Sequence, residues 1–76
     1  MPRYFFHVTH ERRELDLEGA ELPDEHTAWN EATVRAGQIL KGLDGKLTPD
    51  REWRMEVVDE SRITLYVLRI KAEKRK

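Results

Sequence analysis

The three histidines are the residues best suited to metal binding, and their spacing decides how they can act. His7 and His10 are separated by two residues, the spacing of a possible metal pair. They lie in or beside a segment with a strand pattern, where positions three apart point to opposite faces, so joint ligation is disfavoured. His26 could join either one, with Asp24 or Glu25 as oxygen ligand, in a zinc site. We favour solvated or sheet-face histidines and predict no metal ligand and no cofactor.

Nucleophilic and phosphate-binding motifs are missing from the sequence. Without cysteine there is no thiolate nucleophile and no disulfide, and Ser61, the only serine, lies outside any Gly-x-Ser-x-Gly elbow. The four glycines form no phosphate-binding loop. Glu14, Asp16 and Glu18 could support acid–base chemistry, but on an exposed edge strand such a row usually discourages aggregation. We therefore expect a protein that is not an enzyme.

Charge is distributed unevenly along the 76 residues. The formal net charge is −1, yet residues 11–31 carry eight acidic side chains against two arginines, a net of −6. The last six residues hold four cations and one glutamate, which leaves −4 for the rest. A nucleic-acid-binding protein usually has a dominant basic face, so this balance disfavours that function. We predict one domain, residues 1–70, followed by a basic, flexible tail, residues 71–76.

One amphipathic helix is predicted over residues 24–42. Asp24, which follows Pro23, is suited to cap the helix, which then begins at Glu25, and Gly42 is placed to end it. At 100° per residue the apolar positions fall on one arc, which must cover a sheet. These positions are Ala28, Trp29, Ala32, Ala36, Ile39, Leu40 and Leu43.

Two pairs of strand-like segments flank the helix: residues 4–8 and 13–18 before it, and 52–58 and 63–70 after it. The fold class is therefore α+β, a two-layer ββαββ sandwich with one helix packed on a four-stranded sheet. The first and last segments are the most apolar and are expected at the centre, in parallel, which gives the strand order 2-1-4-3. The alternative is a meander with another order.

A single helix covers only one face of such a sheet. We expect the helix to face Tyr4, Phe6, Leu15, Leu17, Trp53, Met55, Val57, Leu65 and Val67. The opposite face then carries an apolar patch of Phe5, Val58, Tyr66 and Leu68. Such a patch on a small chain is typical of an interface. We predict a non-enzymatic protein-interaction module that forms homodimers, through this face or an edge strand, or binds an unidentified protein partner.

Two other functions stay open. The same face could bind single-stranded nucleic acid, because aromatic residues among cations can stack bases. The contacting cations would be Arg3, Arg54, Arg69, Lys71, Lys74, Arg75 and Lys76. The chain could also be a small metal-binding protein or an enzyme accessory subunit. The lack of cysteine, of a long apolar run and of a signal peptide in residues 1–6 predicts a cytoplasmic protein that does not contact a membrane.

Several stretches resemble a family of small uncharacterised bacterial proteins. The similarity rests on the opening block from Met1 to Val8, on Glu21-Leu22-Pro23-Asp24 and on Trp53-Arg54-Met55-Glu56-Val57 before Asp59. It extends over nearly the whole chain and implies one compact domain in a bacterial cytosolic protein. It implies no activity or ligand, since the family is a domain of unknown function. The basic ending, residues 71–76, is not part of the family pattern.

Overall fold

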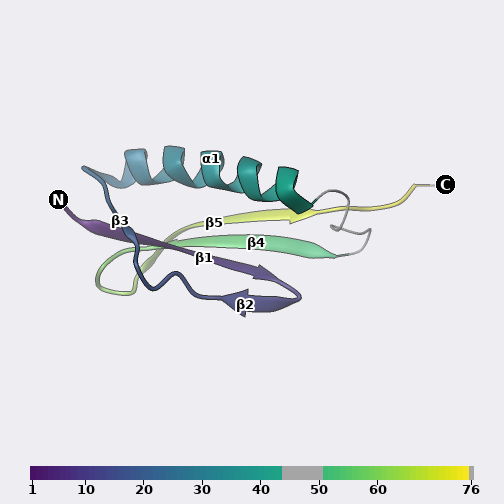
Figure 1. Cartoon of the computed structure of the whole chain (residues 1–76), viewed down its shortest axis with the longest axis horizontal. Helices are drawn as coiled ribbons and strands as arrows, with labels where there is room; N and C mark the ends of the chain where they lie inside the picture. The colour runs from purple at the N-terminus through teal and green to yellow at the C-terminus, as the bar shows by residue number, and fades with distance from the viewer. Residues whose placement is uncertain (44–50, 76) are drawn as a thin grey trace.

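A computed structural model describes residues 1–43 and 51–75 of the chain. The sheet contains β1 (Arg3–His10), β2 (Arg12–Glu14), β3 (Ala20–Glu21), β4 (Glu52–Val58) and β5 (Thr64–Lys71). One helix, α1 (Glu25–Leu43), lies across one face of this sheet, and no other element covers the opposite face in the described residues (Figure 1). The α+β class with one helix on an open sheet is therefore confirmed.

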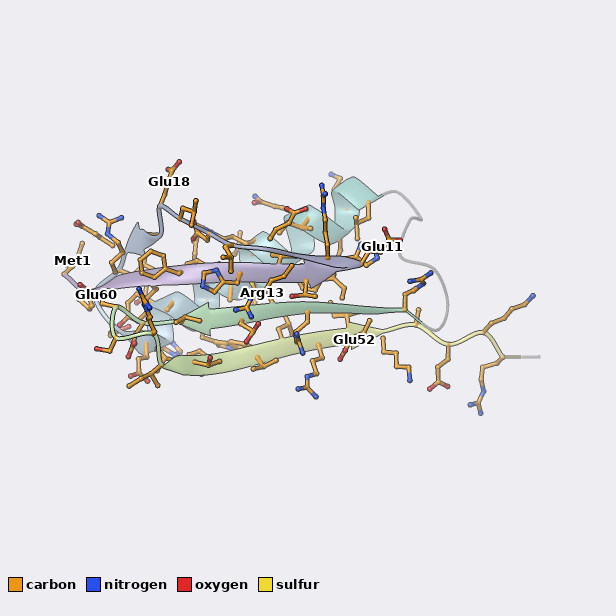
Figure 2. All side chains as sticks on the ribbon, turned by 90° about the horizontal axis from the view of Figure 1, so that it is seen from below. Met1, Glu11, Arg13, Glu18, Glu52 and Glu60 are labelled. Atoms are coloured by element: carbon orange, nitrogen blue, oxygen red, sulfur yellow. The ribbon has the colours of Figure 1, made fainter. Side chains whose placement is uncertain are left out.

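All strand pairs are antiparallel, in the order β2-β1-β4-β5, with β3 also paired to β1. Along the same margin of β1, β2 pairs with its end and β3 with its start (Figure 2). The predicted second strand, residues 13–18, is wrong, because the chain leaves the sheet after Glu14 and returns at Ala20. One margin of the sheet is thus interrupted.

The second half of the predicted order, 2-1-4-3, is also wrong. The strand beside β1 is β4, and β5 lies at the outer margin, so no parallel pair of first and last strands forms. The charged residues Arg54 and Glu56 led to the prediction that β4 is an edge strand. They lie on the face without the helix, where a central strand can keep charges half-buried, while Trp53, Met55 and Val57 on the other face are at most 1% exposed.

The helix begins as predicted, because Asp24 caps it. Its carboxylate accepts hydrogen bonds from the backbone N–H and the hydroxyl of Thr27, both at 2.8 Å. These bonds hold the pKa of Asp24 below its usual range. The helix continues through Gly42 to Leu43. Among the described residues, no helix is both long and apolar enough to cross a membrane.

The core lies between the helix and the middle of the sheet. Ala28, Ala32 and Ala36 are at most 3% exposed, and their small side chains let the helix backbone come close to β1 and β4. The sheet contributes Tyr4 and Phe6 from β1 and the three buried β4 residues. The guanidinium of Arg35 lies 4.3 Å from the centre of the Phe6 ring and covers the margin of this core.

Candidate functional site

The uncovered face of the sheet, which is turned toward the viewer in Figure 2, is open to a ligand or partner. Strand pairing sets its composition, because residues directly opposite one another share a face. Phe5 lies beside Val58, and Thr9 lies beside Arg54. Apolar side chains thus occupy the end near the β4–β5 turn, where Figure 2 shows Glu60, and charged side chains occupy the middle.

A shallow groove of about 540 Å³ opens at the apolar end of this face. Phe5 and Val58 form its floor, Leu15 and Leu17 form one wall, and the β4–β5 turn forms the other. Leu15 is 57% exposed and Leu17 is 84% exposed. The prediction that both leucines face the helix is therefore wrong. The rim is of mixed charge, with Arg13, Asp16, Asp59, Glu60 and Arg62.

Asp16 holds the leucine-bearing wall in place. Its carboxylate accepts hydrogen bonds from the backbone N–H groups of Phe6, Glu18 and Gly19, each at 3.1 Å. Its own N–H donates to Nδ1 of His7 at 3.0 Å. Burial alone would raise the pKa of Asp16, but these bonds and the Arg35 charge outweigh it and lower that pKa. The sequence prediction missed this role because Asp16 lies within an apparently regular alternation.

Arg3 ties the wall to the other side of the groove. Its guanidinium donates to the Glu18 carbonyl at 2.7 Å and to the Glu21 carboxylate at 2.8 Å. Its backbone N–H donates to the carboxylate of Glu60 in the β4–β5 turn at 2.9 Å. Arg3, predicted to contact nucleic acid, is therefore also part of the scaffold of the groove.

The predicted interface residues are split between the two faces. Phe5 and Val58 lie on the uncovered face as expected. Tyr66 and Leu68 pair with Val57 and Met55 and therefore lie on the helix side. The Tyr66 ring packs on Trp29 with centroids 5.1 Å apart.

The faces of β5 were predicted one residue out of register. An irregularity between Val57 and Val58 shifts the pairing of β4 with β5, so that Val58 is opposite Thr64 while Val57 is opposite Tyr66. Because both faces of β5 are apolar, its own sequence could not show which face is inside. Val67, expected under the helix, points outward and is 44% exposed.

Of the cations predicted to contact nucleic acid, Arg54 and Arg69 are cross-strand neighbours on the uncovered face, and the others lie at the start of β1 or at and beyond the end of β5. Arg54 is half-buried, and Arg69 lies 3.7 Å from the carboxylate of Glu52. Lys71 ends β5, and Lys74 and Arg75 follow it in the exposed tail. Lys76 lies outside the described residues. Without Tyr66, Phe5 is the one predicted stacking residue left on the uncovered face.

Three polar atoms at the middle of the uncovered face are buried and have no hydrogen-bond partner in the described part of the protein. They belong to neighbouring residues of β1 and β4: Thr9 Oγ1, Arg54 Nε and Glu56 Oε1. Arg13 Nη2 lies 3.6 Å from the Glu56 oxygen, a charge contact too long for a good hydrogen bond. This cluster can bind water or a polar partner group.

The sheet separates His7 from His10. His7 lines the groove on the uncovered face, whereas His10 lines a smaller pocket of about 210 Å³ between β2 and the end of the helix. His7 uses Nδ1 to accept the Asp16 N–H. Within residues 1–43 and 51–75, no group of three or more histidine or acidic side chains could hold a metal ion.

Comparison with protein families gives one match. Residues 3–71 match a domain of unknown function (DUF6894). The chain belongs to this family. The match begins and ends with the sheet, from the first residue of β1 to the last of β5. No curated protein and no solved structure matches the DUF6894 chain significantly.

Proposed function

We propose that this DUF6894 protein is a small protein-interaction module without catalytic activity, and that it forms a homodimer. The observation that carries the proposal is the contrast between the two margins of its sheet. We place the protein in the bacterial cytoplasm as part of the same proposal, since a chain without cysteine is suited to a reducing compartment.

The margin formed by β2 and β3 is protected against pairing with another strand. These strands contain three and two residues, and the chain between them leaves the sheet. The Asp16 carboxylate takes up the Phe6 N–H that would otherwise face an empty position. Short strands, charges and bulges of this kind prevent edge-to-edge association.

The margin formed by β5 is longer and uninterrupted, and its two charged residues, Arg69 and Lys71, lie within its last three positions. It is eight residues long, contains no proline, and has no strand beyond it in the described part of the chain. Val67 exposes an apolar side chain on one face, and Tyr66, Leu68 and Ile70 are half-buried on the other. On the uncovered face Val67 is followed by Arg69 and Lys71, so the apolar surface of β5 lies at its middle and on its helix side. Pairing with a further strand would cover this surface and satisfy the free backbone groups of the margin.

The test is sedimentation velocity over a concentration series, with matched lysine substitutions. Val67→Lys places a charge on β5, and Val34→Lys places the same charge on the solvent side of the helix, where valine is 55% exposed. We expect the wild type and Val34→Lys to dimerise with equal affinity and Val67→Lys to weaken dimerisation at least tenfold.

A third variant locates the surface if β5 is not responsible. Leu17→Lys alters the wall of the groove and leaves β5 unchanged. Loss of the dimer in Leu17→Lys alone would move the interface to the uncovered face. A wild type that stays monomeric at millimolar concentration would overturn the proposal, and binding to single-stranded oligonucleotides at low salt would favour the nucleic-acid alternative instead.

A further inference from the structure

We infer that the partner of β5 is the β5 strand of a second copy, running antiparallel, so that the basic tail of each copy lies against the acidic turn end of the other. This inference rests on the proposed self-association and specifies its geometry. Two observations carry it: the free β5 margin and a separation of charge along the molecule.

The acidic end of the molecule contains the β4–β5 turn and the start of the helix. Its exposed carboxylates come from the turn residue Glu60 and the helix residue Glu25, and Asp24 and Asp59 lie close by. All four act on Tyr4 in the first strand, where burial and then these charges raise the pKa of the phenol. The four carboxylates therefore lie around the end of β1 that contains Tyr4.

The basic end contains the tail that follows β5. Lys74 and Arg75 are exposed, and the chain extends away from the sheet at the end opposite the N-terminus (Figure 1). The one acidic residue of the described tail, Glu73, lies 3.8 Å from Arg75. Along the long axis, of extent 48 Å, the molecule is thus acidic at one end and basic at the other.

Antiparallel pairing brings opposite charges together. If the two-fold axis passes through Val67, near the middle of β5, then Lys71 of one copy lies opposite Ile63 of the other, one residue beyond Thr64. The next four residues of the tail can extend about 13 Å further, at about 3.3 Å per residue. That distance brings Lys74 and Arg75 beside the partner copy's turn. A closed two-fold assembly forms this contact twice.

The same arrangement places the apolar side chains of β5 in the interior of a continuous sheet. On the uncovered face, Val67 of one copy would lie opposite Val67 of the other. On the helix side, Tyr66 and Leu68 would meet the same residues of the second copy, beside the Trp29 ring that already covers Tyr66. The two helices then lie on the same face of one larger sheet.

The decisive experiment is a charge exchange between two variants. The tail variant carries Lys74→Glu and Arg75→Glu, and the turn variant carries Glu25→Lys and Glu60→Lys. Asp24 and Asp59 are left unchanged, because Asp24 caps the helix and the Asp59 carboxylate accepts the N–H groups of Ser61 and Ile63 in the turn. Glu60→Lys removes the acceptor of the Arg3 backbone N–H, so Glu60→Gln serves as its control for stability. Circular dichroism and thermal unfolding establish that each variant is folded.

We expect each variant alone to dimerise about tenfold more weakly than the wild type, and a 1:1 mixture to recover wild-type affinity as a heterodimer. Contact between the tail of one copy and the turn of the other predicts this recovery. A wild-type dimer whose affinity is unchanged in both variants, or a mixture without recovery, would overturn the inference while leaving self-association standing. A monomeric wild type would overturn both.

Discussion

Asp16 shows how one side chain can replace a stretch of strand pairing. Between β2 and β3 the backbone leaves β1, and the carboxylate accepts the Phe6 N–H that a neighbouring strand would have used. It also fixes the loop by accepting the N–H groups of Glu18 and Gly19. Because the acceptor is ionised, these bonds are stronger than bonds to a neutral amide would be.

The stability of the protein should therefore depend on the ionisation of Asp16. Asp16→Asn keeps an acceptor oxygen but removes the charge, and we expect the free energy of unfolding at pH 7 to fall by about 1 kcal/mol. Urea unfolding measures this loss. Glu14→Gln, an exposed carboxylate on the neighbouring strand, serves as the control and should change stability little.

The pH dependence follows from the direction of the shift. The pKa of Asp16 is lowered in the folded state, so its contribution is fully present above the unfolded-state value of about 3.9 and is lost as pH falls through the folded-state pKa. The difference between wild type and Asp16→Asn should thus shrink below about pH 4. A difference that stayed constant down to pH 2 would contradict this role. Asp24, whose pKa is also lowered, is present in both proteins, so its contribution cancels in the difference of their stabilities.

At the scale of elements, two glycines in different settings make a direct comparison. Gly19 has φ of +71°, and a Cβ there would lie 2.8 Å from the Tyr4 carbonyl oxygen and 2.9 Å from the Phe5 ring. Gly37 lies in the helix, where a Cβ would meet nothing within 4 Å. The same substitution should therefore act in opposite directions at the two positions.

We expect Gly19→Ala to destabilise the protein by at least about 1–2 kcal/mol, because alanine is strained at positive φ and must displace β1 backbone. Gly37→Ala should stabilise it by about 0.5–1 kcal/mol through helix propensity. Thermal and urea unfolding of both variants measure the effects. Equal and small changes in the two proteins would show that the loop does not hold Gly19 against β1.

The helix could be predicted closely from the sequence, and the sheet only in part. Asp24 and the alanine spacing carry local information that the helix uses directly. Strand order depends on which strand edges pair, and this is not a local property of the sequence. Arg54 and Glu56 alternate with apolar residues in the same way on a central strand with one open face as on an edge strand. The faces of β5 and the break after Glu14 depend on a bulge and on Asp16, neither of which has a periodic signal.

The prediction of the candidate site was correct where a strand alternates clearly and wrong where it does not. Phe5 and Val58 could be placed on the uncovered face because β1 alternates clearly and pairs in register with β4. Tyr66 and Leu68 could not, since β5 is apolar on both sides. The prediction that this last strand is central is wrong, because β5 lies at the margin of the sheet.

For the whole molecule, the separation of charge predicts that the proposed dimer is sensitive to salt. The tail contributes a net charge of +3 at one end, and the remaining 70 residues carry −4. At about 0.1 M salt the Debye length is about 10 Å, so contacts between exposed tail and turn charges are substantially screened, whereas apolar contacts along β5 are not. The two contributions to dimerisation can thus be separated by ionic strength.

We expect the dimer dissociation constant to rise about tenfold between 20 mM and 500 mM sodium chloride for the wild type. A variant ending at Lys71 keeps the whole of β5 and loses residues 72–76, so it should dimerise more weakly at low salt, with little change on adding salt. Sedimentation equilibrium of the two proteins at each salt concentration gives the comparison. If the shortened protein kept the same salt dependence, the charges acting in the dimer would lie elsewhere than in the tail.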